Sequence, residues 1–162
     1  SVHEYPTSEE MSEIAISAAR VVRLFGFDPK VAFVSHSTFG QPLTSRTKHI
    51  KKAVDILKEK NVDFEFDGDM QPDVALNDEY KDLYPFSKIV GNANILIMPG
   101  QHSAAISYKM MKTLGDTKVI GPLLIGLGLP IDIAPLRTST SELINLASIA
   151  AYSADKIDYK NN

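Results

Sequence analysis

The chain has 162 residues, of which 44% are hydrophobic and 23% charged, and these values fit one globular domain with a full core. Its formal net charge is −3 and it has no basic block, which argues against nucleic acid or an anionic membrane as a partner. Because the chain contains no cysteine, disulfides and thiolate metal sites are excluded, and we expect a cytoplasmic protein.

The first third of the chain reads as helices alternating with a strand. Thr7 and Glu10 have capping-box spacing, and they predict a helix that Gly26 ends. A run of apolar residues predicts a buried strand at 31–35. After a polar turn, an apolar stripe at helical spacing predicts a second helix at 46–60.

The middle of the chain continues the alternation. Apolar and acidic residues alternate at 62–66, which predicts a half-exposed strand. Pro72 can start a short helix through Leu76, and 77–90 reads as a surface excursion. A buried strand is predicted at 95–98, followed by a helix that Ser103 caps.

The segment from Val119 to Tyr152 predicts two strands joined by a Gly-Leu-Gly-Leu-Pro turn, a short loop and a helix from about Thr140 to Lys156. Ser139 and Glu142 again have capping-box spacing. The two closely spaced strands suggest one antiparallel pairing. We therefore expect a three-layer α/β/α fold with a mixed, largely parallel sheet.

Two polar loops are candidate anion sites. The first, SHSTFG at 35–40, follows a buried strand, and its hydroxyls and glycine suit either an anion or a turn that satisfies its own backbone. The second, at 137–141, combines Arg137 with a helix start, which suits a phosphate group. N-capping beside an exposed arginine is the alternative. The candidate ligand-binding residues are Ser37, Thr38, Gly40, Arg137 and Ser139.

Metal binding is not indicated. Asp67 and Asp69 flank a glycine and could hold a divalent ion or act in acid–base chemistry, but Asp-Gly at a strand end favours a turn. None of the four histidines has zinc-site spacing to another.

Six segments together resemble the phosphate acetyl/butyryltransferase family. They are SHSTFG, FEFDGDMQPDVALN, VGNANILIMPG, SAAISYKMMKTLG, VIGPLLIGLGLPIDI and STSELINLASIAAY. The resemblance covers nearly the whole chain and corresponds to the second half of such an enzyme. We therefore expect residues 1–162 to form a single half-domain. STFG and DGDMQPDVALN are closest to the phosphotransacetylase-like C-terminal domain of bacterial NADP-dependent malic enzymes, so we expect a fragment of a longer chain.

The resemblance implies an isocitrate dehydrogenase-like architecture and transfer of acetyl between coenzyme A and phosphate without a metal. It also implies a Ser-Arg pair that polarises the thioester and holds phosphate, and this chain has Pro135 and Leu136 there. Arg137 lies one position after the expected arginine, and Glu142 matches an aspartate expected to act as base. Since proline and leucine offer no donor, the transfer chemistry should be lost.

We therefore expect a non-transferring regulatory and oligomerisation domain of a malic enzyme, with acetyl-CoA or phosphate as a possible ligand. Its partners would be its own malic-enzyme domain and further copies of the chain. NADP and a divalent metal would bind only in the parent enzyme, which would decarboxylate malate. The alternatives are part of an active phosphate acetyltransferase and a dimerisation module without a ligand.

Overall fold

The computed structural model describes residues 3–116, 118–127 and 129–156. The chain divides into two compact units, Ser1–Tyr108 and Lys109–Asn162, and the boundary falls within helix α4 (Gln101–Leu114). That the whole chain is one half-domain remains a prediction.

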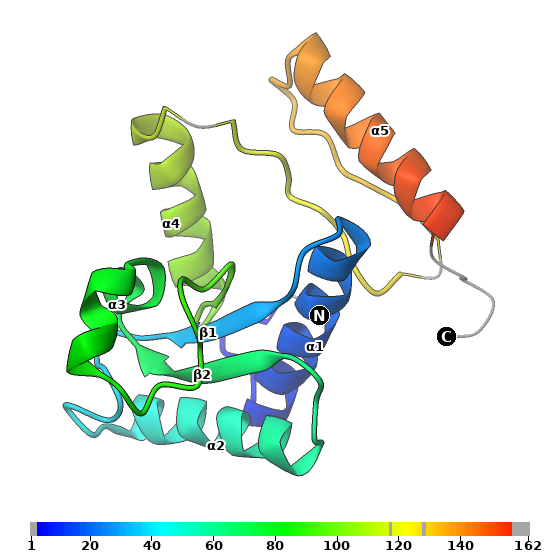
Figure 1. The fold of residues 1–162 in the computed structure, drawn as a ribbon. Coiled ribbons are helices and arrows are strands. Elements are labelled where there is room, and N and C mark those ends of the chain that lie inside the picture. The colour runs from blue at the N-terminus through cyan, green and yellow to red at the C-terminus, as the bar shows by residue number, and fades with distance from the viewer. Residues whose placement is uncertain (1–2, 117, 128, 157–162) are drawn as a thin grey trace. The chain divides into compact units, whose positions relative to one another are not determined.

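The first unit alternates helices and strands in the expected order (Figure 1). Its elements before α4 are α1 (Ser8–Leu24), β1 (Lys30–Val34), α2 (Ser45–Glu59), β2 (Glu65–Met70), α3 (Pro72–Leu76), the 3₁₀ helix η1 (Asp78–Leu83) and β3 (Ile95–Ile97).

Capping boxes start both long helices of this unit. The Thr7 hydroxyl accepts from Glu10 N at 3.1 Å, and the Glu10 carboxylate accepts from Thr7 N at 2.8 Å, which confirms the predicted start of α1. Thr44 and Thr47 form a second box, so α2 begins at Ser45, one residue before the predicted start. These boxes satisfy amide groups that the first helical turn leaves unpaired.

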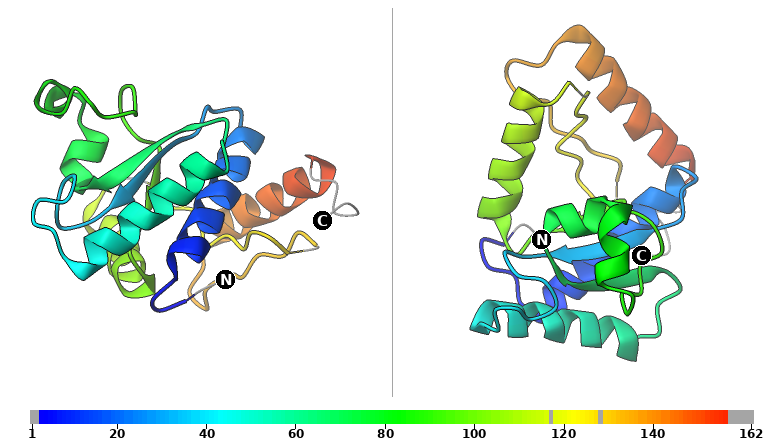
Figure 2. Two further views of the ribbon diagram at one scale, coloured as in Figure 1. Left: turned by 90° about the horizontal axis from the view of Figure 1, so that it is seen from below. Right: turned by 60° about the vertical axis from the view of Figure 1, so that its left-hand side comes forward.

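The sheet has the order β2-β1-β3, and both ladders are parallel. In β1, Val31 and Phe33 belong to one buried cluster with α1 and α2, whereas Ala32 belongs to another with α3. The alternation of a strand thus directs neighbouring residues to opposite faces. Figures 1 and 2 show α1 and α2 on one face and α3 on the other, which confirms the three-layer α/β class.

The second strand differs from its prediction. It runs from Glu65 to Met70 and not over 62–66, so the Asp-Gly-Asp residues lie inside it. Phe33 is paired with Gly68 and Val34 with Met70, which leaves Asp69 as the extra residue of a bulge. The sequence rule that reads Asp-Gly as a turn fails here because pairing with β1 decides the backbone.

Two smaller predictions also need correction. Helix α4 begins at Gln101, and Ser103 is not its cap; the Ser103 hydroxyl lies inside the helix and donates to Gly100 O at 3.0 Å. The segment 77–90 does not lie wholly on the surface as predicted. It contains the 3₁₀ helix η1, and Ile89 is buried in the cluster with α3.

The second unit confirms the predicted helix as α5 (Thr140–Lys156) but not the two strands before it. Residues 118–127 and 129–139 contain no strand, and Ile120, Leu129 and Ile133 are 45%, 65% and 57% exposed. A strand needs a neighbour for its backbone groups, and Pro122 and Pro130 each remove a donor. The predicted antiparallel pairing is therefore absent from the described residues, where both ladders are parallel.

No helix within the described ranges is both long and apolar enough to cross a bilayer.

Candidate functional site

The SHSTFG loop follows β1 and is fastened to the bulge in β2. Asp69 is 3% exposed and Ser37 is fully buried, and the Ser37 hydroxyl donates to the Asp69 carboxylate. Gly40 N donates to the same carboxylate at 3.0 Å, and Phe39 N donates to the Asp69 carbonyl at 2.6 Å. The first two donors compensate the burial of the Asp69 carboxylate, and the third satisfies the main-chain carbonyl of the same residue.

The next residues of the two motifs are joined as well. Gln71 N donates to the Thr38 hydroxyl at 3.2 Å, and the Gln71 side-chain amide donates to His36 O at 3.0 Å. Ser35 N donates to Met70 O at 2.9 Å. The loop and the end of β2 are two separate motifs in the sequence, but in the fold they form one hydrogen-bonded assembly.

Three of the predicted ligand-binding residues lie in this assembly and already have hydrogen-bond partners within the protein. The Ser37 hydroxyl and Gly40 N are both engaged by Asp69, and the Thr38 hydroxyl accepts from Gln71 N. Thr38 is itself buried, whereas the His36 side chain is exposed. A ligand-binding role for Ser37, Thr38 and Gly40 remains a prediction, and such a ligand would compete with these internal bonds.

Asp67 holds a different segment. It is 8% exposed and accepts from Gly68 N at 2.9 Å and from Lys88 N at 2.8 Å. The interpretation of Asp67–Met70 as a turn is wrong, because both carboxylates lie in β2 and serve as acceptors for loops beside it. Among the described residues, no group of three His, Cys, Asp or Glu side chains is arranged to hold a metal ion.

The loop at 137–141 lies in the second unit. Glu142 N donates to the Ser139 hydroxyl at 3.3 Å, and Ser139 N donates to the Glu142 carboxylate at 2.8 Å, which confirms the predicted capping box. Thr138 N donates to Pro135 O at 3.1 Å and closes a turn around Arg137, whose side chain is exposed. Ser139 therefore caps helix α5, and the Arg137 side chain is exposed to solvent.

Beside this turn is a small cleft that belongs entirely to the second unit. Its walls include Lys112, Pro135, Thr138 and Glu142. Lys112 Nζ lies 2.9 Å from the Glu142 carboxylate. The Lys112 side chain is 41% exposed and the Glu142 side chain 33% exposed. Lys112 could not be predicted as a site residue, since no local pattern marks a lysine in the last turn of α4 as a partner for a residue 30 positions later.

The lysine changes what Glu142 can do. The hydrogen bond from Lys112, with those from Ser139, lowers the pKa of Glu142 from 4.5 to about 2. A general base works best when its pKa lies near the working pH. Glu142 is thus a permanently charged partner of Lys112 and a poor base at neutral pH.

We expect the carboxyl carbon of Glu142 to titrate with a midpoint near pH 2 and the Lys112→Met variant to move that midpoint toward 4.5. Because the folded-state pKa is depressed, the contribution of this group to stability is complete above pH 4.5 and is lost as pH falls toward 2. Carbon-detected NMR measures the midpoint. Lys118→Met removes a lysine from the same unit and should leave it in place; equal shifts in both variants would rule out the specific pair.

The candidate residues are distributed over both units. Ser37, Thr38 and Gly40 belong to the first unit, and Arg137 and Ser139 belong to the second. The positions Pro135, Leu136 and Glu142 are also in the second unit.

Comparison with known proteins identifies similar chains. The family model described as phosphate acetyl/butaryl transferase matches residues 1–151. An NADP-dependent malic enzyme of Rhizobium meliloti is 49% identical over 94% of this chain, which spans 20% of that relative. A phosphate acetyltransferase of Clostridium acetobutylicum is 34% identical over 96% of this chain and 47% of its own length.

A solved structure agrees with these matches. The phosphotransacetylase of Streptococcus pyogenes superimposes with a TM-score of 0.89 at 32% identity, covering 97% of this chain and 48% of that one. The chain thus spans about a fifth of the malic enzyme (20%) and about half of the phosphotransacetylase (48%).

Proposed function

Because the chain belongs to the phosphate acetyl/butaryl transferase family, we propose that it is the form of this domain found in NADP-dependent malic enzymes, and that it binds acetyl-CoA without transferring the acetyl group. The 49% identity to the Rhizobium meliloti malic enzyme supports this assignment over a stand-alone transferase. In such a parent, malate decarboxylation with NADP and a divalent metal would take place in another domain, and bound acetyl-CoA would regulate it through a coupling free energy.

The observation that carries the proposal is the chemistry of residues 135–142. The family resemblance implies a hydroxyl and a guanidinium where this chain has Pro135 and Leu136. The Leu136 side chain is fully exposed to solvent, and Pro135 has no N–H to donate. Two of the three positions expected to act in transfer, Pro135 and Leu136, lack the required group. At the third, the Glu142 carboxylate is paired with Lys112.

A second candidate is part of an active phosphate acetyltransferase, and the 34% identity to the Clostridium acetobutylicum enzyme favours it. The two functions differ in whether the chain cleaves acetyl-CoA in the presence of phosphate. A dimerisation module without a ligand is the third possibility, and a titration with acetyl-CoA separates it from the first.

Oligomerisation is part of the proposal. In the second unit, Met110, Met111, Leu114 and Ile144 are between 54% and 77% exposed. So many exposed apolar side chains are unfavourable in water unless another surface covers them. We propose that further copies of the chain, or its own parent domain, supply that cover; sedimentation velocity showing only monomer at tens of micromolar would count against self-association.

We expect the Arg137→Ala variant to bind acetyl-CoA about tenfold more weakly than the unchanged protein. An arginine that is exposed beside a helix start can give a phosphate a charge-assisted hydrogen bond, and one such bond accounts for about 1.5–3 kcal/mol. Isothermal titration calorimetry with acetyl-CoA measures the change. Since Arg137 is exposed, the melting temperature should fall by no more than a few degrees.

Arg20→Ala is the matched control, because Arg20 is also exposed but lies on α1 in the first unit. It should leave the affinity for acetyl-CoA unchanged. If Arg137→Ala behaves like this control, capping is the whole role of the 137–141 loop.

A further inference from the structure

A hollow of about 290 Å³ lies in the first unit between the N-terminal segment and the start of α2. Its apolar walls are made by Pro6, Met11, Ile50 and Pro99, and Tyr5 and Arg46 stand beside them. Met11 and Ile50 are 0% and 1% exposed, so they lie beneath the hollow, whereas Tyr5 at its side is 64% exposed and accessible to a ligand. A space of this volume is at the small end of ligand sites in proteins. The hollow belongs to neither candidate loop described above.

The walls are held by specific contacts. The His49 ring nitrogen Nε2 lies 2.9 Å from Pro6 O, and the Ser8 hydroxyl donates to His49 O at 2.9 Å. These bonds tie the N-terminal segment to α2. A Cβ atom on Gly100 would lie 2.4 Å from Glu4 O, so the segment also sits directly against the start of α4. The hollow is therefore formed by the fold itself before any ligand arrives.

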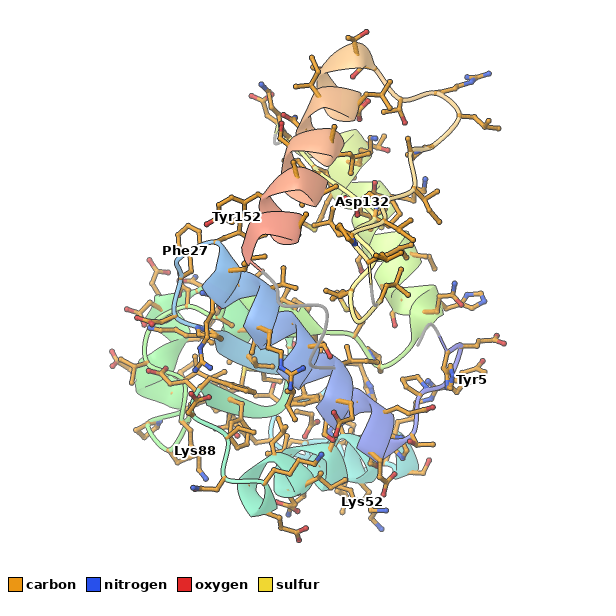
Figure 3. The ribbon with its side chains drawn as sticks, turned by 90° about the vertical axis from the view of Figure 1, so that its right-hand side faces the viewer. Tyr5, Phe27, Lys52, Lys88, Asp132 and Tyr152 are labelled. Atoms are coloured by element: carbon orange, nitrogen blue, oxygen red, sulfur yellow. The ribbon has the colours of Figure 1, made fainter. Side chains whose placement is uncertain are left out.

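The polar side of the hollow has an uncompensated positive charge. The Arg46 guanidinium lies over the Tyr5 ring, 5.2 Å from its centre. Among the residues that the structure describes, no carboxylate is within ion-pairing distance of Arg46, Lys48 or Lys51, whereas Lys52 pairs with Glu9 at 2.8 Å. Tyr5 lies on the N-terminal segment and Lys52 on α2 (Figure 3).

This charge is placed where a helix disfavours it. The first turn of α2 contains no acidic residue but does contain Arg46. The N-terminus of a helix has a partial positive charge, so cations there repel it and anions are favoured. The neighbouring carboxylates do not relieve the repulsion, because Glu9 is paired with Lys52 and Glu10 serves the α1 capping box. Departures from local rules of this kind are expected at functional sites.

We propose that the hollow binds a small organic anion, whose apolar body lies against Tyr5 and Pro99 and whose phosphate or carboxylate group pairs with Arg46. The apolar body would gain from burial against the walls. The planar guanidinium would donate two parallel hydrogen bonds to the anionic group. The cation–π contact with the Tyr5 ring favours one position of the guanidinium, which lowers the conformational freedom that Arg46 loses when the ligand binds.

The test uses phenyl phosphate and benzoate as probes with the full chain and isothermal titration calorimetry. At least one probe should bind, and Arg46→Met should weaken that binding at least about tenfold, the loss expected for a charge-assisted hydrogen bond. The control is Lys51→Met, which removes the same charge from the same helix outside the hollow and should change the affinity less than about twofold. The probe that binds more tightly identifies the anionic group.

Inorganic phosphate and benzyl alcohol test the two halves of the ligand separately. Each should bind at least about tenfold more weakly than the better probe, because each lacks either the apolar body or the charge. Three results would overturn the proposal: no binding of either probe, equal losses in Arg46→Met and Lys51→Met, or inorganic phosphate binding as tightly as phenyl phosphate. The site is independent of the proposed function, since acetyl-CoA binding is tested through Arg137 in the other unit.

Discussion

The Gly68→Ala variant is expected to lose about 2–6 kcal/mol of folding free energy, from a backbone strain of order 1–3 kcal/mol and a steric overlap of similar size. Gly68 has φ = +151°, a conformation that side chains rarely allow. A Cβ there would lie 2.7 Å from Phe33 Cβ and 2.8 Å from Phe33 O, in the middle of the buried sheet. Because the obstacle is backbone, no rotation of a side chain can relieve it. Urea denaturation followed by circular dichroism measures the loss.

Gly26→Ala is the matched control. Gly26 also has a positive φ, +83°, but a Cβ there would meet nothing within 4 Å. We expect a cost of about 1 kcal/mol, from backbone strain alone. If the two variants are destabilised equally, close packing of β2 against β1 is not the reason for glycine at position 68.

The second large effect is the absence of turnover. We expect acetyl-CoA cleavage in the presence of phosphate to stay at background, because loss of a single oxyanion donor costs about a hundred- to a thousandfold in rate. Pro135 and Leu136 remove two such groups, and Lys112 holds Glu142 as an ion pair. Release of free coenzyme A, followed with a thiol reagent, is the measurement, with the missing half of the family fold also supplied.

The phosphate acetyltransferase of Clostridium acetobutylicum provides the positive control, since it is similar over 96% of this chain. Assayed at equal concentration, it sets the rate that an active member reaches. Turnover by the present chain within about tenfold of that control would favour the active-transferase alternative, because losing even one donor costs more than this.

Much of the fold could be predicted because its signals are local. The capping boxes at Thr7 and at Ser139 each join residues three positions apart, and the structure forms both as expected. The buried strand after Pro29 and the helix after Pro72 likewise depend on short patterns. Such features need no knowledge of the rest of the chain.

The features that were missed depend on distant residues. Asp69 and Ser37 are 32 positions apart, and only the parallel pairing of β1 and β2 brings the bulge beside the loop. The same holds for Lys112 and Glu142 across 30 positions. The apolar pattern at 119–133 predicts strands, but a strand also needs a neighbouring strand to pair with, and the described residues provide none for this segment.

The bond between Ser37 and Asp69 joins two segments that both contribute to the resemblance to this family. Ser37 and Asp69 are both buried, and the Asp69 carboxylate accepts from the Ser37 hydroxyl and from Gly40 N. Selection for a folded chain is therefore sufficient to preserve them, with no contribution from substrate turnover. Substitution of Ser37 or Asp69 should therefore lower the folding stability whether or not the chain transfers acetyl groups, because each substitution leaves a buried polar group without its partner.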